Sequence, residues 1–396
     1  MTVSNQTNMN FTLKVLSFCA ALFIISFNSY SQSQDSTSRP LISFDKIKFL
    51  ENIDMTFDMR MGMQAYTFRG GDKYYNGVQF KNEHTALGIS AKVHEKVDLH
   101  FRNRFNKGSD VQTLDQLGSN IELAYINVKA TDQLNILLGK MNTFYGGYEY
   151  QYSAMNILEY NDIYSRALAY VTGAGIRFQA FENHNFGLQI LNSRTMHYDD
   201  LYGDIAAYNV EEPDWPVAVV GNWNGRFFDG KLQTNYSASY SNQVKSRGTY
   251  FFTVGHKYQS KKFSIMYDFE YSYEQIDTKG IMTDIIQNDN VAEDVRYIEN
   301  WMRAEYQFND KFKGLLTLMT SSAYGNFENE KDHTRTSYGV IPTLYFSPFK
   351  DIDIRFYIAY IGRYYDYTDY AKETFNVSNY NKNEARIGFI APFKIL

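Results

Sequence analysis

The sequence predicts an all-β fold, a transmembrane antiparallel β-barrel of about sixteen strands. In residues 53–64 apolar side chains, beginning with Ile53, alternate with polar ones, beginning with Asp54. Tyr 34 and Phe 30 make the chain 17% aromatic, a load typical of barrels with aromatic side chains at both membrane interfaces. Short turns alternate with longer loops along the chain. A strand between lipid and a wet lumen has this period of two.

Taken in order, the segments with this alternation are long enough to cross a membrane, since ~10 residues suffice for a tilted strand. The expected strands are 51–68, 78–94, 97–105, 120–130, 133–142, 168–180, 185–194, 217–228, 231–242, 249–259, 262–274, 296–308, 311–323, 335–347, 352–366 and 383–396.

The connections between these segments fall into two classes. Short turns are expected at 95–96, 131–132, 182–184, 229–230, 260–261, 309–310 and 348–350. Every other connection is expected to be longer, including 106–119, 143–167, 195–216, 275–295 and 367–382. Asp229-Gly230 is a strong two-residue hairpin signal. Short turns at one rim and long loops at the other favour a membrane barrel over a soluble β-sandwich.

The amino terminus predicts a secretory signal peptide over residues 1–31. Lys14 precedes an apolar run at 15–25, and Ser29 and Ser31 form a small-x-small cleavage site before Gln32. The run is short for a membrane anchor. A periplasmic segment is expected at 32–50 and the barrel at 51–396.

Composition excludes several classes of function. The formal charge of -5 becomes -6 when Lys14 leaves with the signal peptide, and no basic stripe suggests nucleic-acid binding. With Cys 1, no disulfide framework or cysteine pair for zinc is expected. The run from Gly225 to Lys231 imitates a phosphate-binding loop, but Leu232 follows where Ser or Thr is needed. No catalytic residue and no cofactor are expected.

Charged side chains on the polar face of the strands predict an aqueous lumen, because about sixteen strands enclose a channel rather than a packed core. The expected lumen-lining residues are Arg60, Arg102, Arg104, Asp268, Glu270, Arg355 and Arg363.

The third long loop, within residues 143–173, is aromatic and too apolar to lie in solvent. Gly146-Gly147 permits a sharp bend at the rim. Residues 154–168 are expected to form a helical turn or two, with Met155, Leu158 and Ile163 against the wall. We expect this loop to fold inward and narrow the pore, and the alternatives are a packed surface loop or a subunit contact. The candidate constriction residues are Glu149, Glu159, Asp162 and Arg166.

Motifs around this loop resemble a known family, the phosphate-selective porin O and P family of Bacteroidetes-type bacteria. The resemblance rests on Leu138-Gly139-Lys140, Tyr145-Gly146-Gly147-Tyr148-Glu149-Tyr150, Glu159-Tyr160 and Tyr170-Val171-Thr172-Gly173. It implies a sixteen-stranded, trimeric outer-membrane porin with an inward third loop. It does not carry phosphate selectivity, which needs a passage rich in Arg and Lys, because this loop nets -2. Leu396 also departs from the usual terminal aromatic residue.

The loops at 195–216 and 275–295 are strongly acidic. Asp199, Asp200 and Asp204 are weak candidates for a calcium or magnesium site that bridges lipopolysaccharide, and the alternative is a solvated acidic rim. Either arrangement should attract cations. The sequence therefore predicts an integral outer-membrane porin in contact with lipid and lipopolysaccharide, for passive diffusion of small polar solutes and ions, leaning towards cations, and the resemblance implies a homotrimer. The alternatives are a substrate-specific or hydrophobic-ligand channel, and a barrel with a mainly structural role.

Overall fold

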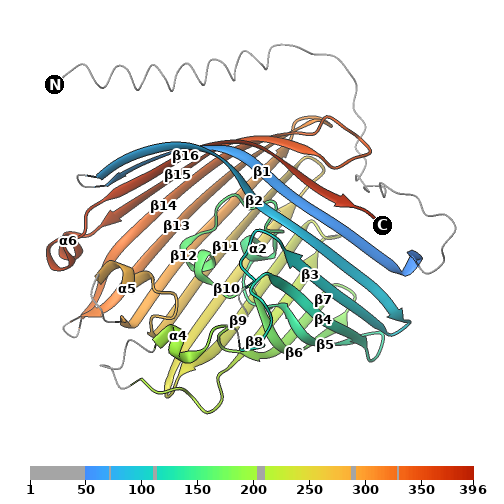
Figure 1. The fold of residues 1–396 in the computed structure, drawn as a ribbon, viewed down its shortest axis with the longest axis horizontal. Helices are drawn as coiled ribbons and strands as arrows, with labels where there is room; N and C mark the ends of the chain where they lie inside the picture. Colours follow the sequence, from blue (N-terminus) through green and yellow to red (C-terminus); the bar gives the residue numbers. More distant parts are fainter. Residues whose placement is uncertain (1–49, 71–72, 110–113, 203–209, 287–290, 328–329) are drawn as a thin grey trace, which may run out of the picture. The chain divides into compact units, whose positions relative to one another are not determined.

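A computed structural model describes residues 50–70, 73–109, 114–202, 210–286, 291–327 and 330–396. The predicted signal peptide lies outside the described residues, as does the predicted segment 32–50 except for its last residue. In the described part of the chain sixteen antiparallel strands form one closed barrel, in which each strand pairs with its neighbours in sequence and β1 pairs with β16 (Figure 1). The predicted fold class is confirmed.

Every expected strand is present within a few residues of its predicted bounds. The strands are β1 (Ile53–Gly70), β2 (Lys73–His94), β3 (Val97–Arg104), β4 (Ile121–Lys129), β5 (Leu134–Asn142), β6 (Tyr170–Phe181), β7 (His184–Asn192), β8 (Val217–Phe227), β9 (Leu232–Val244), β10 (Arg247–Gln259), β11 (Phe263–Ile276), β12 (Glu293–Gln307), β13 (Phe312–Phe327), β14 (Glu330–Phe346), β15 (Arg355–Tyr367) and β16 (Tyr380–Lys394).

The period of two separates the two faces of the wall. On β11, Tyr267 and Phe269 are exposed on the outer face, whereas Asp268 and Glu270 are fully buried on the inner face. Since successive side chains of a strand point to opposite sides, the aromatic residues face lipid and the carboxylates face the barrel interior.

Three connections that were expected to be long are very short. Each consists of two residues: 71–72 between β1 and β2, 245–246 between β9 and β10, and 328–329 between β13 and β14. The prediction of a longer loop at these places is wrong. At these places the strands continue past the last clear polar–apolar alternation, because a strand pairs its backbone groups whatever side chains it carries.

Short helices lie before β1 and in several of the longer connections. They are η1 (Leu50–Asn52), α2 (Tyr148–Gln151), α3 (Asp162–Arg166), α4 (Tyr198–Tyr202), α5 (Ile281–Ile286) and α6 (Asp369–Phe375). Among the described residues, no helix has the length and apolar character needed to span a membrane. In α6 the side chain of Thr368 caps the first turn by accepting from the Ala371 N–H, and Asn376 ends it at a φ of 53°.

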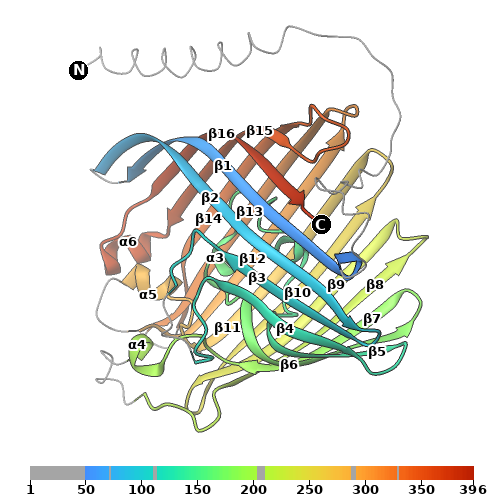
Figure 2. The ribbon, with the colours of Figure 1, turned by 45° about the vertical axis from the view of Figure 1, so that its right-hand side comes forward.

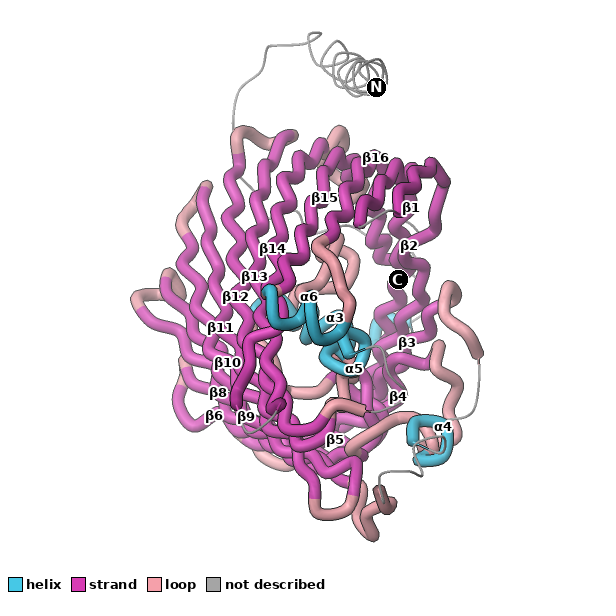
Figure 3. The backbone as a smooth tube through the Cα atoms, turned by 90° about the vertical axis from the view of Figure 1, so that its left-hand side faces the viewer, coloured by secondary structure: helices cyan, strands magenta, loops and turns pink. Residues whose placement is uncertain are grey.

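The connection from β5 to β6, residues 143–169, carries α2 and α3 and is called the inner loop here. It lies inside the ring of strands, as Figures 2 and 3 show from two sides. Met155 and Leu158 are buried with Trp301 and other side chains of the wall, and Ile163 is buried in a second cluster that includes α5. The predicted inward fold and the predicted wall contacts are confirmed. The apolar core of this barrel therefore lies between the inner loop and the wall.

Candidate functional site: the inner loop and the lumen

The inner loop turns into the barrel at two adjacent glycines. Gly146 has a φ of +97°, which side chains other than glycine rarely adopt. Gly147 is needed for a different reason, because a Cβ atom there would lie 2.3 Å from Cγ of Asp268 on β11. The predicted bend is confirmed, and its second glycine brings the backbone of the loop against a wall carboxylate.

Carboxylates accept hydrogen bonds from the first turns of α2 and α3. The Glu149 N–H donates to Oδ2 of Asp268 at 2.8 Å, and the Ile163 N–H donates to Oε1 of Glu299 on β12 at 2.9 Å. Neither helix has a side-chain cap of its own, and the first N–H groups of a helix have no partner within it. The wall therefore supplies the caps. A third carboxylate, Glu149, accepts from the Asn161 N–H at 2.7 Å and ties the two helices together.

These carboxylates form a buried group that we call the acid cluster: Glu149, Asp268, Glu270 and Glu299. All are fully buried, and Glu270 lies directly opposite Glu299 on the neighbouring strands β11 and β12. Within the described residues none of the four forms a salt bridge. Burial raises the pKa of the Glu149 carboxyl well above its ordinary value, and the charges of Glu299 and Asp268 raise it further.

Five wall arginines, here called the arginine clamp, bind the irregular part of the inner loop. This segment has no helix or strand, so its carbonyl groups need partners from elsewhere. The hydrogen bonds run from Arg60 to the oxygens of Ala154 (2.9 Å), Met155 (3.1 Å) and Ile157 (2.6 Å), from Arg303 to Asn156 O (2.9 Å), from Arg355 to Asn156 Oδ1 (3.0 Å), from Arg386 to Leu158 O (2.8 Å) and from Arg363 to Tyr160 O (3.3 Å).

Each arginine of the clamp also has a carboxylate partner. The pairs are Arg60 with Glu83 (2.7 Å), Arg303 with Glu305 (2.8 Å), Arg355 with Asp353 (2.9 Å), Arg363 with Asp162 (2.6 Å), and Arg386 with Glu384 and with Glu83 (3.5 Å). Paired charges are tolerated in a partly dry interior where isolated charges are costly.

Asp162 begins α3 and lies between two wall arginines. Its carboxylate is 2.5 Å from Arg335 on β14 and 2.6 Å from Arg363 on β15. Burial by itself would raise the pKa of this carboxyl, but the two guanidinium groups outweigh burial, and the pKa lies below its ordinary value.

The predicted constriction residues occupy three different environments. Glu149 belongs to the acid cluster and Asp162 pairs with wall arginines. Glu159 keeps 38% of its side chain exposed and lies 3.9 Å from Arg386. Arg166 is 46% exposed and pairs with Asp284 of α5 at 2.6 Å. Glu149 and Asp162 thus make contacts that hold the inner loop in place. Their role in constriction stays a prediction.

The predicted lumen-lining residues divide between two walls. Asp268, Glu270, Arg60, Arg355 and Arg363 lie behind the inner loop. Arg102 and Arg104 lie on β3, where Arg102 is 3.0 Å from Asp58 and both arginines contact Glu122 of β4. The Arg104 side chain keeps 20% exposure against 2% for Arg363. The Arg355 side chain keeps 24%, so Arg104 and Arg355 both retain more exposed surface than Arg363.

Sequence reasoning missed several wall residues that bind the inner loop or pair with its arginines: Arg303, Arg386, Glu299, Arg335 and Glu83. A signal for some of them was available. Glu299 and Arg303 stand two residues either side of Trp301, which is buried on the inner face of β12. Because side chains two residues apart share one face of a strand, the position of Trp301 would have assigned both charges to the inner face of the barrel.

The predicted metal site receives no support from its surroundings. Asp199 and Asp200 are exposed residues of α4, and Asp204 lies outside the described residues. Within the part of the chain that the structure describes, no group of three or more His, Cys, Asp or Glu side chains could hold an ion.

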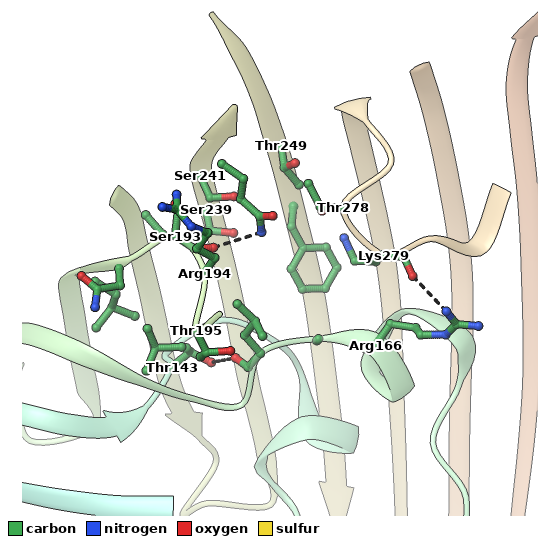
Figure 4. Close-up of a pocket in the computed structure, with 18 of the residues that line it drawn as sticks. Thr143, Arg166, Ser193, Arg194, Thr195, Ser239, Ser241, Thr249, Thr278 and Lys279 are labelled. Carbon is green, nitrogen blue, oxygen red and sulfur yellow. Dashed lines mark hydrogen bonds between the residues drawn. The ribbon is translucent and has the colours of Figure 1, made fainter. Parts of the chain in front are cut away.

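A cavity of about 350 Å³ opens beside the inner loop, above the strands β7 to β10 (Figure 4). Its wall includes Thr143, Arg166 and Leu168 of the inner loop, residues 193–196 and 201 after β7, and residues 277–280, 283 and 291 after β11. It lies at the rim that carries the long loops.

The sequence family agrees with this architecture. A family model described as phosphate-selective porin O and P matches residues 55–393. The chain belongs to this porin family. No curated protein matches the chain. Family membership and the closed barrel establish an outer-membrane porin, integral to the outer membrane.

Solved outer-membrane channels share the fold of this porin. The channel DcaP of Acinetobacter baumannii has a TM-score of 0.61 at 11% identity, over 89% of this chain and 100% of that chain. The anion-selective porin of Comamonas acidovorans has 0.56 at 8% identity, over 86% and 99%. Salmonella typhi OmpF, in complex with daunomycin, has 0.54 at 12% identity, over 86% and 98%. At these identities the likeness establishes the fold alone.

Proposed function

We propose that this porin is a passive, non-enzymatic, water-filled channel for small polar solutes and ions. The observation that carries the proposal is the asymmetry of the lumen. Arginines of β1, β12, β15 and β16 hold the inner loop against one part of the wall, while charged side chains of β3, such as Arg104, remain partly exposed. Solutes then pass between Glu159 on the loop and the β3 wall.

We further propose that the channel prefers cations. The connection 195–216 contains Asp199, Asp200, Asp204, Glu211, Glu212 and Asp214 and no Lys or Arg. A fixed negative field at the mouth raises the local concentration of cations, and low salt strengthens the effect because screening is weaker. Reversal potentials in a salt gradient test this preference. A clear anion preference would mean that Arg102 and Arg104 outweigh the acidic rim.

Deletion of residues 150–165 tests the inner loop as the constriction. The strands and turns of the barrel are untouched, so the barrel should still assemble, with lower stability because wall contacts of the loop are lost, and its single-channel conductance should rise. If the loop instead braces a subunit contact, the deletion dissociates the oligomer and leaves conductance per channel unchanged. This second result would overturn the constriction.

Two conservative variants locate the charge that ions meet. Glu159→Gln should reduce the cation preference, because a carboxylate at a narrow point acts on ions through few intervening waters. Glu149→Gln is the matched comparison, and its effect on selectivity should be smaller because Glu149 is fully buried. An equal or larger effect of Glu149→Gln would place the ion path behind the loop.

We propose a homotrimer, as the family resemblance implies, with lipid and lipopolysaccharide around its exposed aromatic belt. Tyr250, Phe252 and Phe269 belong to that outward surface. Chemical cross-linking of the detergent-extracted porin should give a three-subunit band that heat in detergent converts to a monomer. A product that never exceeds one subunit would contradict the trimer.

A further inference from the structure

The cavity beside the inner loop is lined by hydroxyl groups that have no partner of their own. Within the described residues, the Oγ atoms of Ser193, Thr195, Ser239, Ser241 and Thr249 make no hydrogen bond. Ser193 is almost completely buried, and its Oγ atom is cut off from solvent. Hydroxyl groups that line one cavity without a protein partner can donate to and accept from the same occupant, which is a feature of sites for polar solutes.

These hydroxyls come from separate parts of the chain. Ser239 and Ser241 stand on the inner face of β9, Thr249 stands on β10, and Ser193 and Thr195 follow the end of β7. Figure 4 shows them around a single space. A solute that enters from outside meets this space before it reaches Glu159.

The cations at the cavity already have counterions. Arg166 pairs with Asp284 at 2.6 Å, Arg194 pairs with Glu212, and Lys279 pairs with Glu274. An anionic solute would have to compete with these carboxylates. The site therefore suits a neutral solute with many hydroxyl groups, which can use the serines and threonines without disturbing the ion pairs.

Apolar surfaces complete the lining. Phe251 on β10 and Tyr145 of the inner loop present rings, and Leu191 and Val220 present aliphatic side chains. A sugar has hydroxyl groups at its edge and C–H groups on its faces, and binding sites combine apolar walls with a few placed polar groups. A volume of about 350 Å³ admits a small saccharide.

We propose that this cavity is a binding subsite for a neutral saccharide of one or two rings. The proposal rests on the proposed function, because it places the subsite in the path of a conducting channel. It makes the porin a channel with a weak preference at its mouth rather than a uniform sieve.

The test uses the full-length porin in planar bilayers, with glucose, maltose or gluconate added at the long-loop side. Maltose and glucose should lower the ion current reversibly and to saturation, whereas gluconate, with a carboxylate, should do so at least about tenfold less well. An unchanged current with both sugars overturns the subsite, and stronger action by gluconate overturns its neutral character. A porin that conducts no current at all contradicts the proposed function instead.

Ser241→Leu should fill the cavity and weaken the effect of maltose by about tenfold or more, since it removes a hydroxyl and adds bulk. The matched control is Ala238→Leu, which adds bulk to the outer face of the same strand, where Ala238 is exposed. Calorimetric titration of the detergent-solubilised porin with maltose gives a second readout that does not depend on conduction. Equal action of maltose on both variants would overturn the assignment of the cavity.

Discussion

The two helices of the inner loop and the segment between them are bound to the wall by opposite kinds of hydrogen bond. At α2 and at the start of α3, backbone N–H groups donate to wall carboxylates, and the acid cluster has no cationic partner among the described residues. Between these helices, at residues 154–160, backbone carbonyls accept from the arginine clamp, and each of its arginines has a counterion. Wall carboxylates accept from the N–H groups of the loop, and wall arginines donate to its carbonyl groups. An irregular segment can therefore lie inside the barrel with hydrogen-bond partners for its backbone.

Two carboxylates of the inner loop, Glu149 and Asp162, should also respond to pH in opposite directions. The pKa of Glu149 is raised, so its contribution to docking is fully present below the ordinary pKa of Glu and is lost as pH rises through the raised value. The pKa of Asp162 is lowered, so its contribution is present above the ordinary pKa of Asp and is lost as pH falls through the lowered value. Four substitutions in the inner loop test how much each of its contacts contributes to stability.

The largest effect is expected from Asp162→Asn. The variant leaves the buried guanidinium groups of Arg335 and Arg363 without their shared carboxylate, and breaking such a pair costs about 3–5 kcal/mol of stability. Urea unfolding of the refolded barrel measures the loss. Asp369→Asn is the control, because Asp369 is exposed and pairs with Lys372 at 3.5 Å. Similar losses in both variants would remove the special role of the buried pair.

Gly147→Ala should have the next largest effect. The added Cβ would meet the Asp268 carboxylate, so α2 must move away from the wall at a cost of about 1–3 kcal/mol. The same unfolding experiment measures the cost, with Gly221→Ala as control because a Cβ at Gly221 meets nothing within 4 Å. Equal stability of the two variants would mean that α2 does not depend on close approach to Asp268.

Glu149→Gln should change stability little in acid and increase it in alkaline conditions. The amide has no charge to bury, so the loss of docking strength expected for the native chain at high pH should be absent. Unfolding midpoints across the pH range above the ordinary pKa of Glu check this. A variant less stable than the native chain at every pH would show that the Glu149 carboxylate is ionised and paired.

The smallest effect is expected from Arg166→Gln, which breaks the exposed pair with Asp284. Pairs of this kind contribute about 0.2–1 kcal/mol, and salt weakens them. The change in unfolding midpoint should shrink further at high salt. A loss as large as that of Asp162→Asn would make the contact with α5 part of the anchorage.

The sequence was sufficient for the barrel because lipid and water impose a simple rule on each strand. Alternation in segments such as 263–273 gave the strand and also its outward face. Gly146-Gly147, followed by an aromatic loop with Met155 and Ile163, was enough to predict inward folding. The rule failed at strand ends such as those of β9 and β10, where backbone pairing continues beyond the last clear alternation.

The sequence by itself thus determined the sixteen strands, their faces and the inward loop, because each depends on neighbours in sequence or on the surrounding solvent. Only the tertiary structure decided which inward charges bind the loop and which meet water. Arg363 and Arg104 have the same alternation on their strands, yet one is buried against the inner loop and the other stays partly exposed. The difference arises from where residues 143–169 come to lie, a contact between segments far apart in the chain that no local pattern encodes.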